Sequence, residues 1–181
     1  FFSRRIGIGD NGVQQPIDGG VRLSGKVAGS TNVGLLHMQT QAINELASDA
    51  FSVARVSQEL ANRSSIGAIF VRRQGEEDAD YNNTYAIDGR WGIGDELTIS
   101  AYLAQTETPG RRGDDQAVRI RINNTTESWS TSGGYTKVGK NFNPEVGFLT
   151  RTNYEKVDFS IFHRRRPENL WGLFELRPHM Y

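Results

Sequence analysis

Apolar and polar side chains alternate along the segment from Glu96 to Thr106. The apolar positions are Leu97, Ile99, Ala101 and Leu103, and the polar positions between them are Thr98, Ser100 and Tyr102. A period of two places the two sets on opposite faces of an extended strand. The segment has 11 residues, which exceeds the usual soluble strand of about five or six and matches the roughly nine to eleven that a tilted strand needs to cross a bilayer.

The same alternation recurs along the chain and accounts for about ten strands. We expect these strands over residues 21–27, 32–40, 51–61, 65–73, 85–93, 96–106, 118–122, 127–132, 145–151 and 157–165. A short strand is expected near 4–8, and 170–177 starts a further excursion of the chain. The link 41–50 has room for one helical turn.

The links between the expected strands alternate in length. Short turns lie near residues 30, 63, 94, 124 and 153, and longer polar connections separate the hairpins. Short turns at one end and long loops at the other are typical of an outer-membrane barrel. Such a barrel must close because hydrocarbon offers the backbone no hydrogen-bond partners. We therefore predict an all-β fold, an antiparallel up-and-down meander that forms part of a transmembrane β-barrel. Residues 1–181 are interpreted as a single partial barrel domain, truncated at both ends.

Composition agrees with this interpretation and excludes several functions. Hydrophobic residues make up 36% of the chain and the mean hydropathy is -0.54, as expected where only one face of each strand is apolar. Lys plus Arg and Asp plus Glu number 21 each, so no global basic field indicates nucleic acid as a partner. The chain has no cysteine, which excludes disulfides, thiol catalysis and thiolate metal sites.

Aromatic residues near the ends of the expected strands could form the girdles found at membrane interfaces. The candidates are Tyr85, Trp91, Tyr102, Trp129, Tyr135, Phe148 and Trp171. Aromatics are also common in any strand, so each alone is weak support. The segment 65–73 departs from the pattern because both of its faces carry apolar residues, and a bulge at Gly67 is the one irregularity the sequence offers there.

The titratable residues do not form a recognisable catalytic or metal-binding motif. Glu76, Glu77, Asp78 and Asp80 make an acidic loop. They lack the Gly turn and distal Glu of an EF-hand, so a solvated loop is the preferred interpretation. The three histidines, His37, His163 and His179, have no metal-ligand spacing. We therefore nominate no catalytic, metal or cofactor-binding residue and expect no cofactor.

Two groups of arginines stand out. Arg164, Arg165 and Arg166 end a strand, where they could bind lipopolysaccharide phosphates or, as we prefer, anchor the rim. Arg119 and Arg121 alternate with the apolar positions of their strand. They would point into the lumen, where they could bias a pore toward anions.

Several short motifs occur in order along nearly the whole chain. They are Ser3-Arg4-Arg5-Ile6-Gly7, Gly19-Gly20-Val21-Arg22-Leu23-Ser24-Gly25-Lys26, Asn32-Val33-Gly34-Leu35-Leu36, Arg63-Ser64-Ser65-Ile66-Gly67 and Asn141-Phe142-Asn143-Pro144-Glu145-Val146-Gly147-Phe148. Together these motifs resemble the bacterial domain of unknown function 5916. The resemblance implies an outer-membrane barrel that usually follows a carbohydrate-binding family 9-like domain. It implies no catalytic residues.

The leading expectation is a non-enzymatic protein of the bacterial outer membrane, either a channel or the anchor of a sugar-binding module. Its partners would be membrane lipid and, through an associated domain outside these residues, a carbohydrate. Two alternatives stay open: a soluble all-β carbohydrate-binding module, and a carbohydrate-active enzyme with its site in the long loops. The long strands and the low apolar fraction speak against the soluble module.

Overall fold

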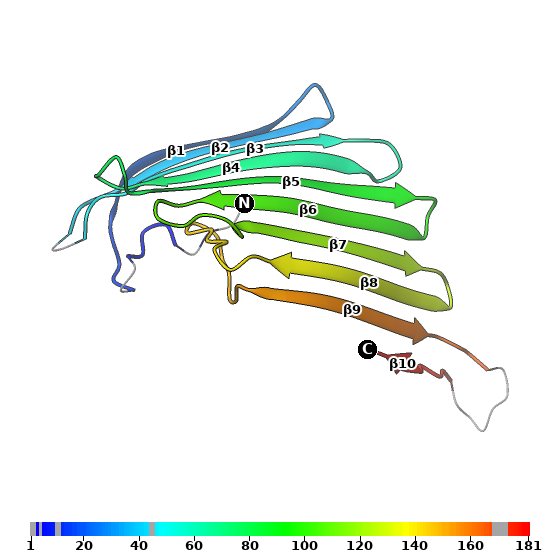
Figure 1. Cartoon of the computed structure of the whole chain (residues 1–181). Helices are drawn as coiled ribbons and strands as arrows, with labels where there is room; N and C mark the ends of the chain where they lie inside the picture. Colours follow the sequence, from blue (N-terminus) through cyan, green and yellow to red (C-terminus); the bar gives the residue numbers. More distant parts are fainter. Residues whose placement is uncertain (1–2, 4, 10–11, 44–45, 168–173) are drawn as a thin grey trace.

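The computed structural model describes residues 3, 5–9, 12–43, 46–167 and 174–181. These residues form one antiparallel sheet in which every strand pairs with its neighbours in the sequence (Figure 1). The strands are β1 (Ile17–Val27), β2 (Thr31–Thr40), β3 (Ala50–Glu59), β4 (Ser65–Gln74), β5 (Tyr81–Ile93), β6 (Leu97–Glu107), β7 (Gln116–Thr125), β8 (Trp129–Val138), β9 (Tyr154–His163) and β10 (His179–Met180). The all-β, up-and-down meander predicted from the sequence is confirmed. The described residues contain no helix that could span a membrane.

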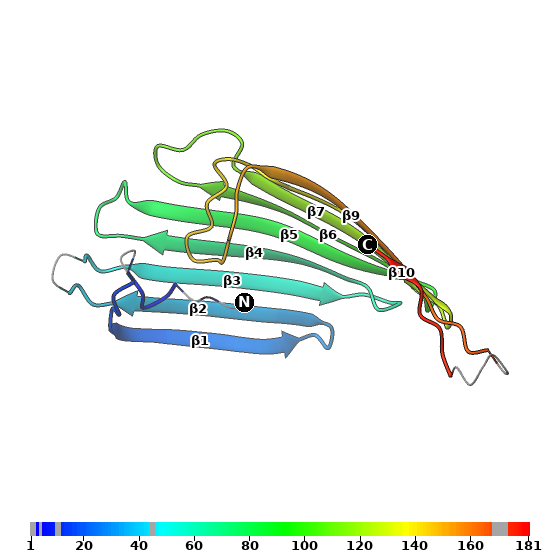
Figure 2. The same cartoon turned by 90° about the horizontal axis from the view of Figure 1, so that it is seen from below.

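The sheet is curved and open, with β1 and β10 as its two edges (Figures 1 and 2). Short turns, 28–30, 60–64, 94–96 and 126–128, join the strands at one end. Longer connections, 41–49, 75–80, 108–115 and 139–153, join them at the other. The link from β9 to β10 is long although it leaves from the short-turn end. The predicted alternation of short and long links therefore holds as far as β9.

The strand register separates side chains into two unlike faces. Val33, Val56, Ala68, Ile87, Leu103 and Val118 form one continuous row across β2 to β7. We call their side of the sheet the apolar face and the opposite side the polar face. Large exposed hydrophobic residues on the apolar face are Val21, Leu23, Val27, Leu35, Val56, Ile66, Tyr85, Ile87, Trp91, Ile93, Leu103, Ile120, Ile122, Trp129, Tyr135, Val157, Phe159 and Met180. Most large exposed hydrophobic residues of the strands thus lie together on one side of the sheet.

The buried core lies on the other side, between the polar face and the connection 139–153. Val146, which is 1% exposed, packs on Phe51, Val53 and Val71. Phe142 of the same connection packs with a second group, Ala104, Ala117 and Val138. The connection and the N-terminal segment lie on the concave side of the sheet (Figures 1 and 2).

This core explains why β4 carries apolar residues on both of its faces. Val71 belongs to the cluster around Val146, and Ile69 packs against it. The predicted bulge at Gly67 is wrong, because the β4 register runs without a shift on both sides. A Cβ on Gly67 would meet Nη2 of Arg55 at 2.6 Å and the carbonyl oxygen of Val56 at 3.1 Å. Glycine is therefore needed here to leave room for the Arg55 guanidinium, rather than to interrupt the ladder.

The expected strand at 145–151 is also wrong. These residues belong to the connection 139–153, which turns away from the sheet after Gly139 and returns only at Tyr154. The backbone N–H of Glu145 donates to the side chain of Asn82 instead of to a neighbouring strand. Pro144 has no N–H to give a ladder. The turn expected near 153 is consequently the end of a long loop, not the tip of a hairpin.

Several smaller expectations also differ. The described part of 4–8 forms a turn and a single bridge from Ile8 to Gln14 instead of a strand, and Arg4 lies outside the described residues. The described part of 41–50 has a bridge between Ile43 and Leu46 and no helical turn. Of the expected excursion 170–177, residues 170–173 lie outside the described part, and Leu176 makes one bridge.

Candidate functional site on the polar face

Connection 139–153 is fixed to the sheet by an ion-pair cluster around Arg73. The guanidinium of Arg73, at the end of β4, contacts Asp49 at 2.8 Å, Asp80 at 2.5 Å and Glu145 at 2.7 Å. These carboxylates come from three different connections, and the Arg73 side chain is 19% exposed. Charge-assisted contacts of this kind are the stronger hydrogen bonds in proteins. Arg73 therefore ties the long loops to one another and to the wall of the sheet.

Buried polar side chains add a second attachment. Asn82 is 1% exposed; its Nδ2 donates to the carbonyl of Asn143 and to Oγ1 of Thr108, both at 2.8 Å. Thr106, also buried, accepts a hydrogen bond from the N–H of Asn143 at 3.0 Å. Because an unpaired buried polar group is costly, these contacts hold the connection in one position over the concave surface.

The polar face away from this loop carries more basic than acidic side chains. The basic ones on β1 to β9 are Arg22, Lys26, Arg55, Arg90, Arg119, Arg121 and Lys156, and the acidic ones there are Glu59, Asp88 and Asp158. Three of the basic residues are paired closely: Lys26 with Glu59 at 2.6 Å, Arg55 with Asp88 at 2.9 Å, and Arg121 with Asp158 at 2.6 Å. Arg119 and Arg121 lie on this face, as the alternation predicts.

A hollow of about 510 Å³ opens among these charges between β4 and β7. We call it the arginine hollow; its polar lining is Ser65, Asp88, Arg90, Ser100, Tyr102, Arg119 and Arg121. Sequence reasoning noted two of these arginines but missed Arg90. Asp88 and Arg90 alternate with the apolar Ile87 and Trp91, so the same pattern that nominated Arg119 also contained the signal for Arg90.

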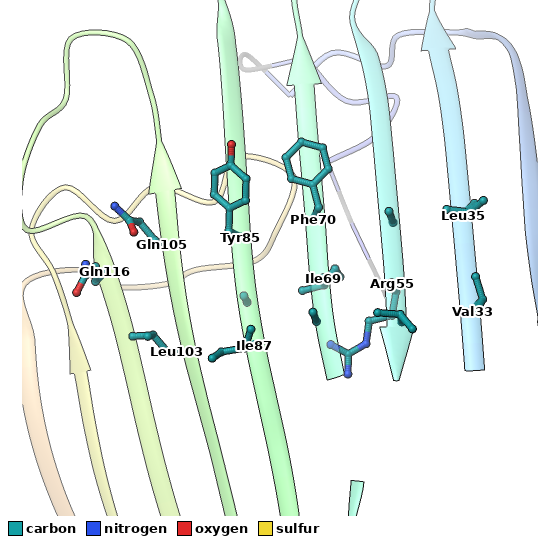
Figure 3. A pocket seen from close by; sticks show the side chains of 14 residues that line it. Val33, Leu35, Arg55, Ile69, Phe70, Tyr85, Ile87, Leu103, Gln105 and Gln116 are labelled. Atoms are coloured by element: carbon teal, nitrogen blue, oxygen red, sulfur yellow. The ribbon is translucent and has the colours of Figure 1, made fainter. Parts of the chain in front are cut away.

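The apolar face has a different character. A shallow hollow of about 630 Å³ lies over β2 to β7, and Figure 3 shows Phe70, Tyr85, Ile87 and Leu103 projecting from neighbouring strands while the connections pass behind the sheet. The rings of Phe70 and Tyr85 are 5.2 Å apart. The polar groups labelled on this face, Gln105 and Gln116, lie toward the long-loop end. Such a surface suits an apolar environment rather than a polar ligand.

The aromatic candidates do not all lie on one face of the sheet, and the girdle itself stays a prediction. Tyr85, Trp91, Trp129 and Tyr135 lie on the apolar face, and Trp129 stacks on His163 with ring centroids 4.1 Å apart. Two candidates lie elsewhere. Tyr102 lies on the polar face opposite Asp88 and Arg119, and Phe148 lies in the connection 139–153, where it is 71% exposed. Trp171 lies outside the described residues.

The acidic loop is occupied by contacts within the protein. Glu76 accepts hydrogen bonds from the N–H and the hydroxyl of Ser48, both at 3.2 Å, and Asp80 pairs with Arg73. The hydrogen bond from Arg73 lowers the pKa of Asp80 below its ordinary value. Over the described part of the chain, no three His, Asp or Glu side chains are grouped so that they could hold a metal ion.

Two of the histidines and the arginine run considered in the sequence analysis also have contacts in the structure. His37 is hydrogen-bonded to Ser52 at 2.9 Å, and His179 packs edge-on to Tyr181. In the arginine run, Arg166 contacts Glu175 at 2.9 Å and Arg164 contacts it at 3.6 Å. These ion pairs cross the link between β9 and β10, which agrees with a role in anchoring this rim.

Comparisons of the chain with protein-family models, with curated proteins and with solved structures gave no match. The two faces of the sheet and the connection 139–153 are therefore the features from which function is inferred.

Proposed function

We propose that the sheet is a section of the wall of a bacterial outer-membrane β-barrel, with its apolar face toward lipid and its polar face toward an aqueous lumen. One observation carries this proposal: the large exposed hydrophobic residues of the strands, apart from Ile17 and Tyr102, lie on the apolar face, from β1 to β10. Contiguous exposed apolar surface on a soluble monomer rarely exceeds a few hundred Å². A surface that continues across the whole sheet is the arrangement expected of a barrel wall in hydrocarbon.

The height of the apolar band supports this orientation. On β5 it runs from Tyr85 to Ile93, about 27 Å along the strand at roughly 3.4 Å per residue. A strand tilted by about 35–45° projects this length to roughly 19–22 Å, which is of the same order as the roughly 25 Å apolar band of outer-membrane barrels. Beyond Tyr85 the same face becomes polar, with Asn83, Glu107 and Gln116 toward the long-loop end. The change in polarity marks an interface in the proposed membrane position.

In this arrangement the protein acts as a channel or as a membrane anchor. Connection 139–153 lies on the concave side, where it would narrow the lumen at the long-loop end. Its attachment through Arg73 and Asn82 makes it a fixed part of the wall. An association with carbohydrate follows only from the resemblance to the domain of unknown function 5916, and the geometry adds no sugar site to it.

The direct test is the location and heat stability of the complete gene product. We expect it in the outer-membrane fraction, and we expect its mobility on a detergent gel to shift when the sample is boiled. A soluble protein without a mobility shift would contradict the proposal. It would favour a soluble all-β module, with the long loops as its binding or catalytic surface.

A further inference from the structure

The arginine hollow is built from neighbouring rows of the sheet register. Ser65, Arg90, Ser100 and Arg121 are consecutive partners across β4, β5, β6 and β7. The next row on the same face carries Tyr102 and its partner Arg119. Adjacent strands are about 4.8 Å apart, so the three arginines converge on an area roughly 10 Å across. Their positions are set by the backbone ladder, which is the most rigid part of a sheet.

The charges around the hollow do not balance. Asp88 on β5 is engaged by Arg55, which reaches it from β3 across β4, and Arg121 is engaged by Asp158. Within the described residues, Arg90 and Arg119 form no ion pair with a carboxylate. Two guanidinium charges therefore face the hollow without compensation.

One further donor is unused. The Nε–H group of Arg121 is buried and makes no hydrogen bond to the described residues. Buried donors without a partner are uncommon and call for a specific explanation. The hydroxyl groups of Ser65, Ser100 and Tyr102 add neutral donors around the same hollow.

We propose that the arginine hollow binds the oxyanion group of a small molecule, a phosphate ester or a carboxylic acid. Guanidinium groups recognise both anions through paired hydrogen bonds. The volume, about 510 Å³, falls in the range of small-molecule sites, so it accommodates a sugar-sized body attached to the anion. Arg90 and Arg119 supply the charge, and the hydroxyl groups orient the ligand.

This inference rests on the proposed function only for the position of the site inside a lumen. In that position the uncompensated arginines would favour anions over cations in transit. Anion binding itself depends on the polar face alone and does not require that the protein conduct.

The test is calorimetric titration of the complete protein, in detergent micelles at low ionic strength, with inorganic phosphate, glucuronate and glucose. We expect saturable binding of at least one of the two anions and none of glucose. Binding of phosphate alone would assign the site to phosphate esters, and binding of glucuronate alone would assign it to carboxylic acids. No saturable binding of either anion, or equal binding of glucose, would overturn the proposal.

Variants show whether the hollow is the site. Arg119→Gln and Arg90→Gln should each raise the Kd about tenfold or more, because each removes a charge-assisted contact. Arg22→Gln is the matched control, since Arg22 is an exposed arginine on the same face of β1. It should change the Kd less than twofold. Equal weakening by all three would indicate a diffuse charge effect and overturn the site.

The two proposals fail in different ways. A heat-induced mobility shift confirms that each variant is folded. If one of the two arginine variants lacks this shift, the other variant still tests the site. Membrane location without anion binding would contradict the site and leave the barrel standing. Anion binding by a protein found in the soluble fraction would leave the site standing and remove its position in a channel.

Discussion

Replacing Ile87 with lysine distinguishes a lipid-facing wall from a water-facing sheet. Ile87 lies on β5 in the middle of the apolar face, between Val56–Ala68 on one side and Leu103–Val118 on the other. The residue is 59% exposed. The packing lost on substitution is therefore small, and the cost depends mostly on what surrounds the face.

The two environments predict different magnitudes. If the face meets water, Ile87→Lys changes an exposed strand position, where the whole scale of strand propensity spans only about 1 kcal/mol. If the face meets the bilayer midplane, a lysine there costs about 2–4 kcal/mol. A cost of 3 kcal/mol corresponds to more than a hundredfold change in the folding equilibrium, at about 1.4 kcal/mol per tenfold.

The assay is reversible denaturant unfolding of the complete protein in lipid vesicles, followed by the heat-induced mobility shift. Thr98→Lys is the matched control, because Thr98 lies on the polar face of the adjacent strand and lysine there would be solvated by the lumen. We expect a loss of about 2–4 kcal/mol for Ile87→Lys and less than about 1 kcal/mol for Thr98→Lys. Equal small effects for both would refute the assignment of the faces.

Three further predictions test the interior of the structure. Gly67→Ala should cost about 1 kcal/mol in the same unfolding assay, because the added Cβ would displace the Arg55 guanidinium and crowd the carbonyl oxygen of Val56. Gly133→Ala, where a Cβ meets nothing within 4 Å, should be nearly neutral. Val146→Ala should cost about 2 kcal/mol by leaving a cavity under the connection 139–153; a neutral result would show that this connection does not pack on the wall. The lowered pKa of Asp80 means that its contribution to stability is present above its unfolded pKa, near 4, and is lost as the pH falls through its folded pKa. Asp80→Asn should therefore lower stability at pH 7 and flatten the acid limb of the stability profile, and an unchanged profile would contradict this role.

The sequence predicts the sheet well where no loop covers it, because apolar side chains then alternate with polar side chains along each strand. Leu97 to Leu103 alternate strictly, and the side chains of β6 lie on the expected faces. Prediction was poorer where a loop covers the sheet. Val71 and Ile69 look like an error in the pattern until Val146 is placed against them. That contact joins residues far apart in the sequence, and periodicity carries no information about it.

The ends of strands were also difficult to predict, for a related reason. β8 continues through Gly133 and Gly134 to Val138, and two glycines remove the side chains by which alternation is recognised. Segment 145–151 contains apolar residues at strand-like spacing, yet it forms the inward connection because Val146 is buried and the N–H of Glu145 is bonded to Asn82. Apolar spacing does not show what a side chain packs against, and its contacts decide whether the segment lies in a strand.

The candidate site depends on an excess of basic residues on one face of the sheet. The composition of the whole chain does not show this excess. Basic and acidic residues balance over the whole chain, and this balance argued against any field that would attract a charged partner. The balance holds for the molecule and not for each face: on the polar face Asp88 and Asp158 are already engaged by arginines. Arg90 and Arg119 stay uncompensated there because the matching acidic residues lie elsewhere, including loop carboxylates such as Asp49 and Glu145, which bind Arg73. A neutral protein can therefore present a positive surface to a solute on one side, because screening limits interactions to roughly 10 Å and the solute responds to the nearest charges.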